Sequence, residues 1–176
     1  MFIPLKVMYP AAEVPAVAMS WQIGLDPILH CGLGAALAPL RDEGVLIAGA
    51  EMSHHNLRDF AAQAPASFAF HGWVDTALAN TRDVCTRYLA QWHRASGGQA
   101  SHPREEHLMP LMVASGAGSD LPGRVIWRGA VGPTRLGGLG IRLTENAQVP
   151  AVARATSPSA CLPAKGGQNP PQSGHR

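Results

Sequence analysis

The first half of the chain carries two short apolar runs separated by a stretch with helical periodicity. Residues 14–20 and 45–50 are short, apolar and bounded by proline or glycine, which favours two buried strands. Between them, apolar positions recur at helical spacing over residues 27–40, directly after Asp26, a preferred helix-capping residue. Gly44 is a natural stop for that helix. The order strand, helix, strand predicts a βαβ unit in a parallel or mixed sheet, with the helix crossing between two neighbouring strands.

Further helical patterns follow, and then the character of the chain changes. Residues 67–79 and 81–94 place large apolar side chains at helical spacing, and another helix is predicted within residues 101–118. From residue 131 to the end, 13 of 46 positions are Gly or Pro and none is aromatic, which is typical of loops and disordered segments. We therefore predict one folded unit over residues 1–130, followed by a Gly/Pro-rich, disordered tail over residues 131–176.

Composition excludes several classes of partner. Apolar residues make up 46% of the chain, enough for a real core, and the formal net charge is only +2, which gives no case for nucleic acid as a partner. No run approaches the ~18 consecutive apolar residues of a membrane span. The three cysteines lie far apart without a Cys-x-x-Cys pair, which excludes a disulfide framework and fits a reducing cytoplasm.

The eight histidines suggest where chemistry could occur. One polar cluster, which contains His55, directly follows the predicted strand 45–50, and the carboxyl end of such a strand is the usual edge for a site. A second cluster contains His102 and His107 at a predicted helix start. Neither cluster has the spacing of a known metal motif, and a lone loop histidine is most often solvated or hydrogen-bonded. Spacing alone therefore leaves both a site role and an ordinary surface role open.

Several sequence blocks in one order point to a family. They are Tyr9-Pro10, Val14-Pro15, residues 38–47 (APLRDEGVLI), residues 55–58 (HNLR), His102-Pro103, residues 106–111 (EHLMPL) and Gly116-Ala117. Over residues 1–128 this series resembles the carboxyl-terminal half of the class III extradiol ring-cleavage dioxygenases, in the DOPA dioxygenase branch.

The resemblance implies a fold, a reaction and a metal. Such enzymes are α/β proteins with a mixed or mainly parallel central sheet flanked by helices. They open the ring of a small catechol-type diol with O2 at ferrous iron, although some members are assigned zinc instead. His107 matches a metal ligand of the family. His55 matches a histidine that is interpreted either as a metal ligand or as the catalytic acid–base residue. His102 matches a position that we assign to substrate binding.

The family also carries a segment, with further histidine ligands, before the part that this chain resembles. We therefore expect a fold that is incomplete relative to the family and ring cleavage that is impaired in this chain alone. An alternative is a non-catalytic remnant or a binding module that pairs with another chain supplying the missing half. A third hypothesis, a zinc-dependent hydrolase using His55 and His107, has no motif in its support.

Overall fold

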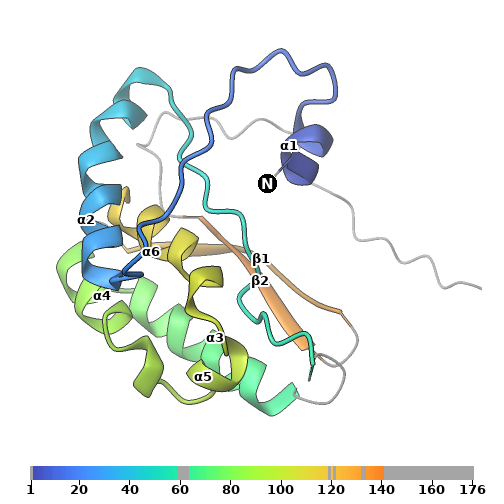
Figure 1. The fold of residues 1–176 in the computed structure, drawn as a ribbon, viewed down its shortest axis with the longest axis vertical. Helices are drawn as coiled ribbons and strands as arrows, with labels where there is room; N and C mark the ends of the chain where they lie inside the picture. Colours follow the sequence, from blue (N-terminus) through green and yellow to red (C-terminus); the bar gives the residue numbers. More distant parts are fainter. Residues whose placement is uncertain (1, 59–63, 119, 121, 132–133, 141–176) are drawn as a thin grey trace, which may run out of the picture.

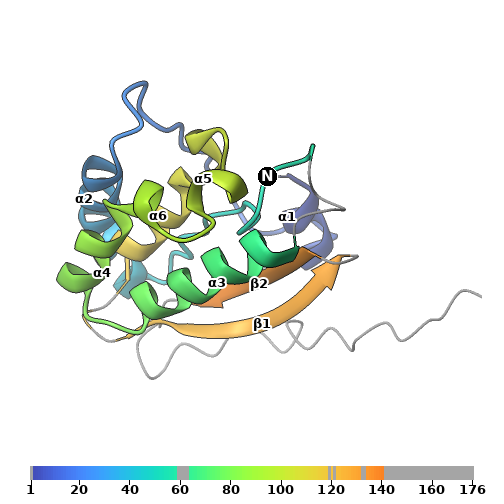
Figure 2. The ribbon, with the colours of Figure 1, turned by 90° about the horizontal axis from the view of Figure 1, so that it is seen from below.

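The computed structural model describes residues 2–58, 64–118, 120, 122–131 and 134–140. A layer of short helices packs on one side of α3 (Ala64–Leu78), and an antiparallel hairpin of β1 (Arg124–Val131) and β2 (Thr134–Gly140) packs on the other. Figure 2 shows α3 lying along the hairpin, with the remaining helices beyond it, and α1 (Phe2–Met8) on the opposite side of the molecule from α2 (Pro27–Leu37). No helix among the described residues is both long and apolar enough to cross a membrane.

The helices begin and end where local chemistry favours it. The Asp26 carboxylate accepts hydrogen bonds from the backbone N–H groups of Ile28 and Leu29 at 2.8 and 3.4 Å, so the predicted cap of α2 (Pro27–Leu37) is confirmed. The chain tightens into η1 (Ala38–Glu43) and stops at Gly44, whose φ of 84° suits glycine. The remaining helical segments are α4 (Arg82–Leu89), η2 (Trp92–Arg94), α5 (Gly98–Ser101), η3 (Glu105–His107) and α6 (Met109–Gly116).

The core lies where α3 meets α4 and α6. Its fully enclosed side chains include Phe70 and Val74 of α3, Leu89 of α4 and Met112 of α6. The helical periodicity predicted the buried face of α3 correctly. On α4, Cys85 and Leu89 are buried, whereas Tyr88 is 40% exposed.

Helices α2 and α6 lie side by side (Figure 1) and approach closely through two glycines. A Cβ on Gly34 would collide with the Val113 carbonyl, and a Cβ on Gly116 would collide with the Cys31 carbonyl. Because backbone atoms line both contacts, neither neighbour can move aside as a flexible side chain would. The close approach of α2 to α6 therefore depends on these two positions having no side chain.

The predicted strands over residues 14–20 and 45–50 are wrong as strands, because neither segment joins a hydrogen-bonded ladder in the described part of the chain. Neither forms regular secondary structure, and several of their apolar side chains face solvent: Val17 is 94% exposed and Leu46 is 51% exposed. Apolar composition predicts a strand only when neighbouring strands and helices cover it. The central parallel or mixed sheet is accordingly not seen among the described residues, although α2 does lie between the two segments along the chain.

The prediction of a disordered tail from residue 131 is also wrong for part of that segment. Residues 134–140 form β2, which pairs with β1 in the register Trp127↔Gly138 and Arg128↔Gly137. Backbone hydrogen bonds build this ladder, so glycines that count as breakers by composition can still take part in it. The other residues of the predicted tail, 132–133 and 141–176, lie outside the described residues.

A pair of glycine substitutions tests the packing of α2 against α6. We expect Gly34→Ala to lower the free energy of unfolding by about 1–3 kcal/mol, because the added methyl group forces two backbones apart. The matched control is Gly32→Ala in the same helix, where a Cβ meets nothing within 4 Å. That control should raise stability by about 0.5–1 kcal/mol, since alanine is the better helix former. Urea denaturation of both variants measures the difference, and equal effects would contradict the close contact.

Candidate metal centre

The loop of residues 51–56 is held against α5 by backbone and side-chain hydrogen bonds. The His55 N–H donates to the Ser101 carbonyl at 2.8 Å, and the Asn56 side-chain amide donates to the Ala100 carbonyl at 2.9 Å. The start of α5 needs Gly97, whose φ is 75° and whose Cα faces the Ala66 carbonyl without room for a side chain. These contacts fix where the His55 imidazole emerges from the loop.

The structure brings together His55 and His107, which are far apart in sequence. Their imidazole rings stack with centroids 3.5 Å apart and an interplanar angle of 20°. The Glu51 carboxylate lies beside both rings, with Oε2 3.4 Å from His107 Nδ1 and Oε1 3.6 Å from His55 Nε2. One donor atom from each of the three residues lies within 4.8 Å of the others, an arrangement that could hold a metal ion. All three side chains are partly accessible to solvent.

Glu51 is the residue that sequence reasoning did not assign to the site. The available signal was its place in the polar segment after residues 45–50, four positions before His55. That signal is weak, because an acidic residue in a polar loop is ordinary. Only the folded arrangement shows that its two oxygens face two different histidines.

A second carboxylate lies on the other side of His107. Glu106 Oε1 is 3.9 Å from His107 Nε2 and forms an ion pair with Arg104. A hydrogen bond from its own backbone N–H, and then the Arg104 guanidinium, hold the pKa of the Glu106 carboxyl below its usual range. The charged Glu106 carboxylate therefore faces His107 Nε2, whereas Glu51 faces His107 Nδ1.

His102 is enclosed within the fold and contacts the site loop through its backbone. Its exposed fraction is 1%, its ring packs against Phe70 and Trp92, and its Nε2–H donates to the Ser53 carbonyl at 3.1 Å. Burial lowers the pKa of His102 to about 4, against the opposing effect of the Ser53 hydrogen bond, and the neighbouring histidines lower it further. His102 is thus neutral at ordinary pH. The substrate-binding role stays a prediction, and in this structure His102 holds the loop in place.

A chain of polar contacts connects the same loop to the rest of the fold. His71 of α3 lies with Nδ1 3.4 Å from the Ser53 hydroxyl and Nε2 3.7 Å from Asp75 Oδ1. The other oxygen of Asp75 accepts a hydrogen bond from Arg128 of β1 at 2.7 Å. His54, next to His55, is fully buried as well. Sequence spacing marked neither His54 nor His71 as part of this buried polar group.

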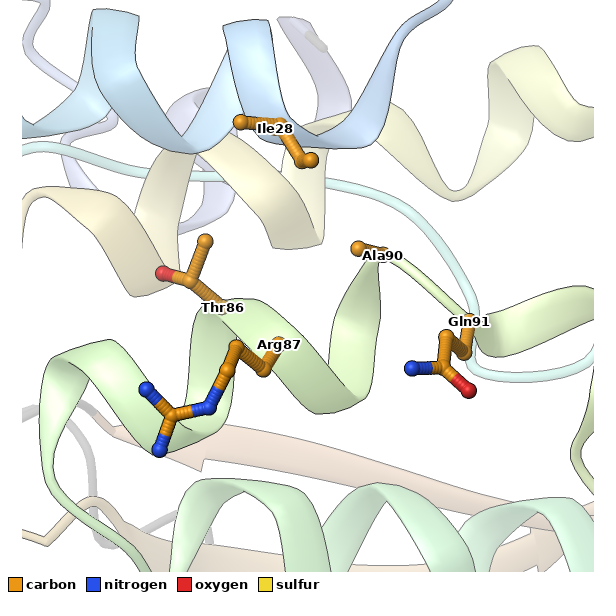
Figure 3. Close-up of a pocket in the computed structure, with 5 residues that line it drawn as sticks. All are labelled: Ile28, Thr86, Arg87, Ala90 and Gln91. Atoms are coloured by element: carbon orange, nitrogen blue, oxygen red, sulfur yellow. The ribbon is translucent and has the colours of Figure 1, made fainter.

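A surface pocket of about 370 Å³ lies elsewhere, between α2 and α4 (Figure 3). It is lined by Ile28, Thr86, Arg87, Ala90 and Gln91, and the Arg87 guanidinium turns away from Ile28. The lining contains no histidine, cysteine or carboxylate. It therefore offers no acid–base or metal chemistry, and the histidine cluster remains the candidate site.

The low pKa of His102 predicts how stability responds to pH. His102 takes up a proton near pH 6.5 in the unfolded state but only near pH 4 in the folded state. The free energy of unfolding should therefore fall by about 3 kcal/mol as the pH drops through this window. In His102→Gln, whose amide can still donate to Ser53, this contribution should vanish. The matched control is His93→Gln at an exposed position, which should keep the full decline. Urea denaturation at several pH values is the measurement, and an equal decline in all three proteins would contradict the assignment.

Comparison with known proteins places this geometry in a family context. No family model matches the chain. The protein named 4,5-DOPA dioxygenase extradiol from Beta vulgaris is 39% identical over 124 residues, which cover 68% of this chain and 45% of that protein. Its namesake from Escherichia coli K12 is 31% identical over 115 residues, which cover 62% of this chain and 42% of that protein.

A solved structure is also similar to this chain. The crystal structure of an uncharacterised protein from Escherichia coli K12 matches with a TM-score of 0.70 at 28% identity, over 78% of this chain and 59% of that one. The chain spans about half the length of the curated relatives that it matches. The family indicated by the sequence blocks is therefore confirmed: the chain is a homologue of the extradiol dioxygenases of the DOPA dioxygenase branch.

Proposed function

We propose that this chain carries part of the catalytic site of an extradiol dioxygenase, an enzyme that opens a catechol-type aromatic ring with O2. The observation that carries the proposal is the stacked pair of His55 and His107 beside the Glu51 carboxylate. Both histidines lie in the sequence blocks that resemble the family, and the curated relatives are named as extradiol dioxygenases. The substrate class proposed here is a small aromatic diol.

His55 and His107 are the residues that would hold the metal. Their imidazoles fit this role, because imidazole nitrogen suits iron and zinc, and both rings are accessible and face a carboxylate that would offset a cation's charge. Ferrous iron is the metal we propose, with zinc as the alternative. When bound, such an ion supplies Lewis acidity and a common point at which diol and O2 can meet.

The chain's own residues would also handle a proton. A catechol must lose a hydroxyl proton to chelate a metal, and the imidazole of His55 is the group that would accept it. Glu51 Oε1, 3.6 Å from His55 Nε2, would stabilise the imidazolium that results. His55 therefore fits either of the two roles drawn from the family, metal ligand or base. His102 contributes as a positioning residue, because it holds the Ser53 carbonyl of the same loop.

A second candidate function is a binding module that pairs with another chain. Exposed apolar side chains in the segment before α2 favour it, since Val17 is 94% exposed, Ile23 is 100% exposed and Trp21 is 50% exposed. Several large apolar side chains exposed within one short segment are a feature of surfaces that bind a partner. In this function a partner would cover the segment and supply the remaining part of a catalytic domain.

Oxygen uptake distinguishes the two functions. With ferrous iron and 4-methylcatechol under air, we expect slow oxygen consumption with formation of a yellow ring-opened product. His107→Ala should reduce the rate at least about tenfold, because a metal-holding imidazole is lost. The matched control is His93→Gln, which lies away from the cluster on η2 and should leave the rate unchanged.

Two outcomes would contradict the proposed dioxygenase function or its site. Equal rates in the unchanged chain and in His107→Ala would contradict the site assignment. A chain that consumes no oxygen above the iron-only background would favour the non-catalytic binding module.

A further inference from the structure

A serine, a histidine and an aspartate lie in one line between the loop of residues 51–56 and α3. The Ser53 hydroxyl lies 3.4 Å from His71 Nδ1, and the other ring nitrogen of His71, Nε2, lies 3.7 Å from Asp75 Oδ1. His71 and Asp75 are four residues apart on α3 and therefore share one face of that helix. The imidazole thus has a hydroxyl on one side and a carboxylate on the other.

Contacts outside this group hold its members in place. The Ser53 carbonyl accepts a hydrogen bond from the enclosed His102 ring, and the Arg128 guanidinium donates to Asp75 Oδ2 at 2.7 Å. Because Arg128 occupies one carboxylate oxygen, the other oxygen of Asp75 is the one that faces His71. The His71 side chain is 1% exposed, so close packing restricts its rotation. Ser53 is only partly buried, which leaves this residue accessible from solvent.

We propose that Ser53 is a nucleophile activated by His71, that Asp75 orients the imidazole, and that the three give the chain a metal-independent esterase activity toward small activated esters. A nucleophile beside a base, with the base oriented by a third group, activates serine in unrelated folds. The separations of 3.4 and 3.7 Å exceed those of a working site, and such contacts are often loose before a substrate binds. This activity needs neither His55 nor His107 and does not rest on the proposed dioxygenase function.

The reaction follows from the order of the three groups. The Asp75 carboxylate favours the proton on His71 Nε2, which leaves the lone pair of Nδ1 for the Ser53 hydroxyl. As Ser53 Oγ attacks the carbonyl carbon of an ester, its proton passes to Nδ1, and Asp75 stabilises the imidazolium. The bond from that carbon to the alcohol oxygen then breaks, and the departing alcohol takes the proton from Nδ1. Water cleaves the acyl–serine bond by the same proton route and releases the carboxylic acid.

Covalent labelling of the whole chain with an alkyl fluorophosphonate tests the nucleophile, because an activated serine forms a phosphorus–oxygen bond with this probe and fluoride leaves. With EDTA present, peptide mass spectrometry should find the adduct on Ser53. Ser53→Ala should lose the adduct, and its hydrolysis of p-nitrophenyl acetate should fall to the background rate. The matched control is Ser20→Ala, which removes an exposed serine outside this group and should react like the unchanged chain.

Variants of the other two residues test the base and the residue that positions it. His71→Gln should slow p-nitrophenyl acetate hydrolysis at least about a hundredfold, because the proton acceptor is lost. Asp75→Asn should slow it at least about tenfold, since the amide can donate to Nε2 and so place the ring proton on Nδ1. Asp75→Glu restores a carboxylate and should recover part of the rate, which a loss of packing alone would not allow. Circular dichroism verifies that each variant is folded.

The outcomes decide the proposal independently of the dioxygenase function, which is measured by oxygen uptake. A folded, unchanged chain without an adduct on Ser53 overturns the proposal, as do equal rates of hydrolysis in the unchanged chain and Ser53→Ala. A folded His71→Gln that labels and hydrolyses at the full rate overturns the role of His71. If His71→Gln does not fold, the Ser53 and Asp75 variants decide the matter, and full rates in both Asp75 variants contradict the arrangement. An adduct confined to Ser53, with slow reaction in His71→Gln and Asp75→Asn, supports it.

Discussion

The candidate site depends on how the loop of residues 51–56 is held against α5. Among the hydrogen bonds that fix it are those from the His55 N–H to the Ser101 carbonyl and from His102 Nε2 to the Ser53 carbonyl. Because one partner is backbone and the other an enclosed side chain, the loop has little freedom to slide. His107 follows on η3, a few residues beyond His102, so the same short region of chain positions both imidazoles.

The state of charge around the loop also suits a cation. Burial keeps His102 neutral, so it adds no positive charge beside His55 and His107. The acidic groups nearest the two imidazoles are Glu51 and Glu106, and the latter is held in its charged form. Carboxylates beside the two imidazoles attract a divalent ion, because opposite charges at short range stabilise each other.

The helical layer provides the rigid support for this loop. Residue Gly49 lies against the Pro110 carbonyl with no room for a side chain, which joins the segment before the loop to α6. Helix α6 in turn packs closely on α2 through Gly34 and Gly116. The loop is thus anchored at both ends, by α6 before it and by α5 after it. The exposed apolar side chains of residues 14–23 lie outside this support and belong to the surface on which the proposed binding function rests.

Local chemistry in the sequence determined the helices, because a cap, a stop or a periodic apolar face acts over a few residues. Asp26, Gly44 and the buried face of α3 were predictable for that reason. The ordered sequence blocks likewise identified the family and singled out His55 and His107. Strands could not be determined in this way, since a ladder needs a partner: residues 45–50 lack one among the described residues, whereas the glycine-rich β2 has β1. Only the tertiary structure decided that Glu51 also faces His107 and that His102 is enclosed against Ser53, because these contacts join residues that are distant along the chain.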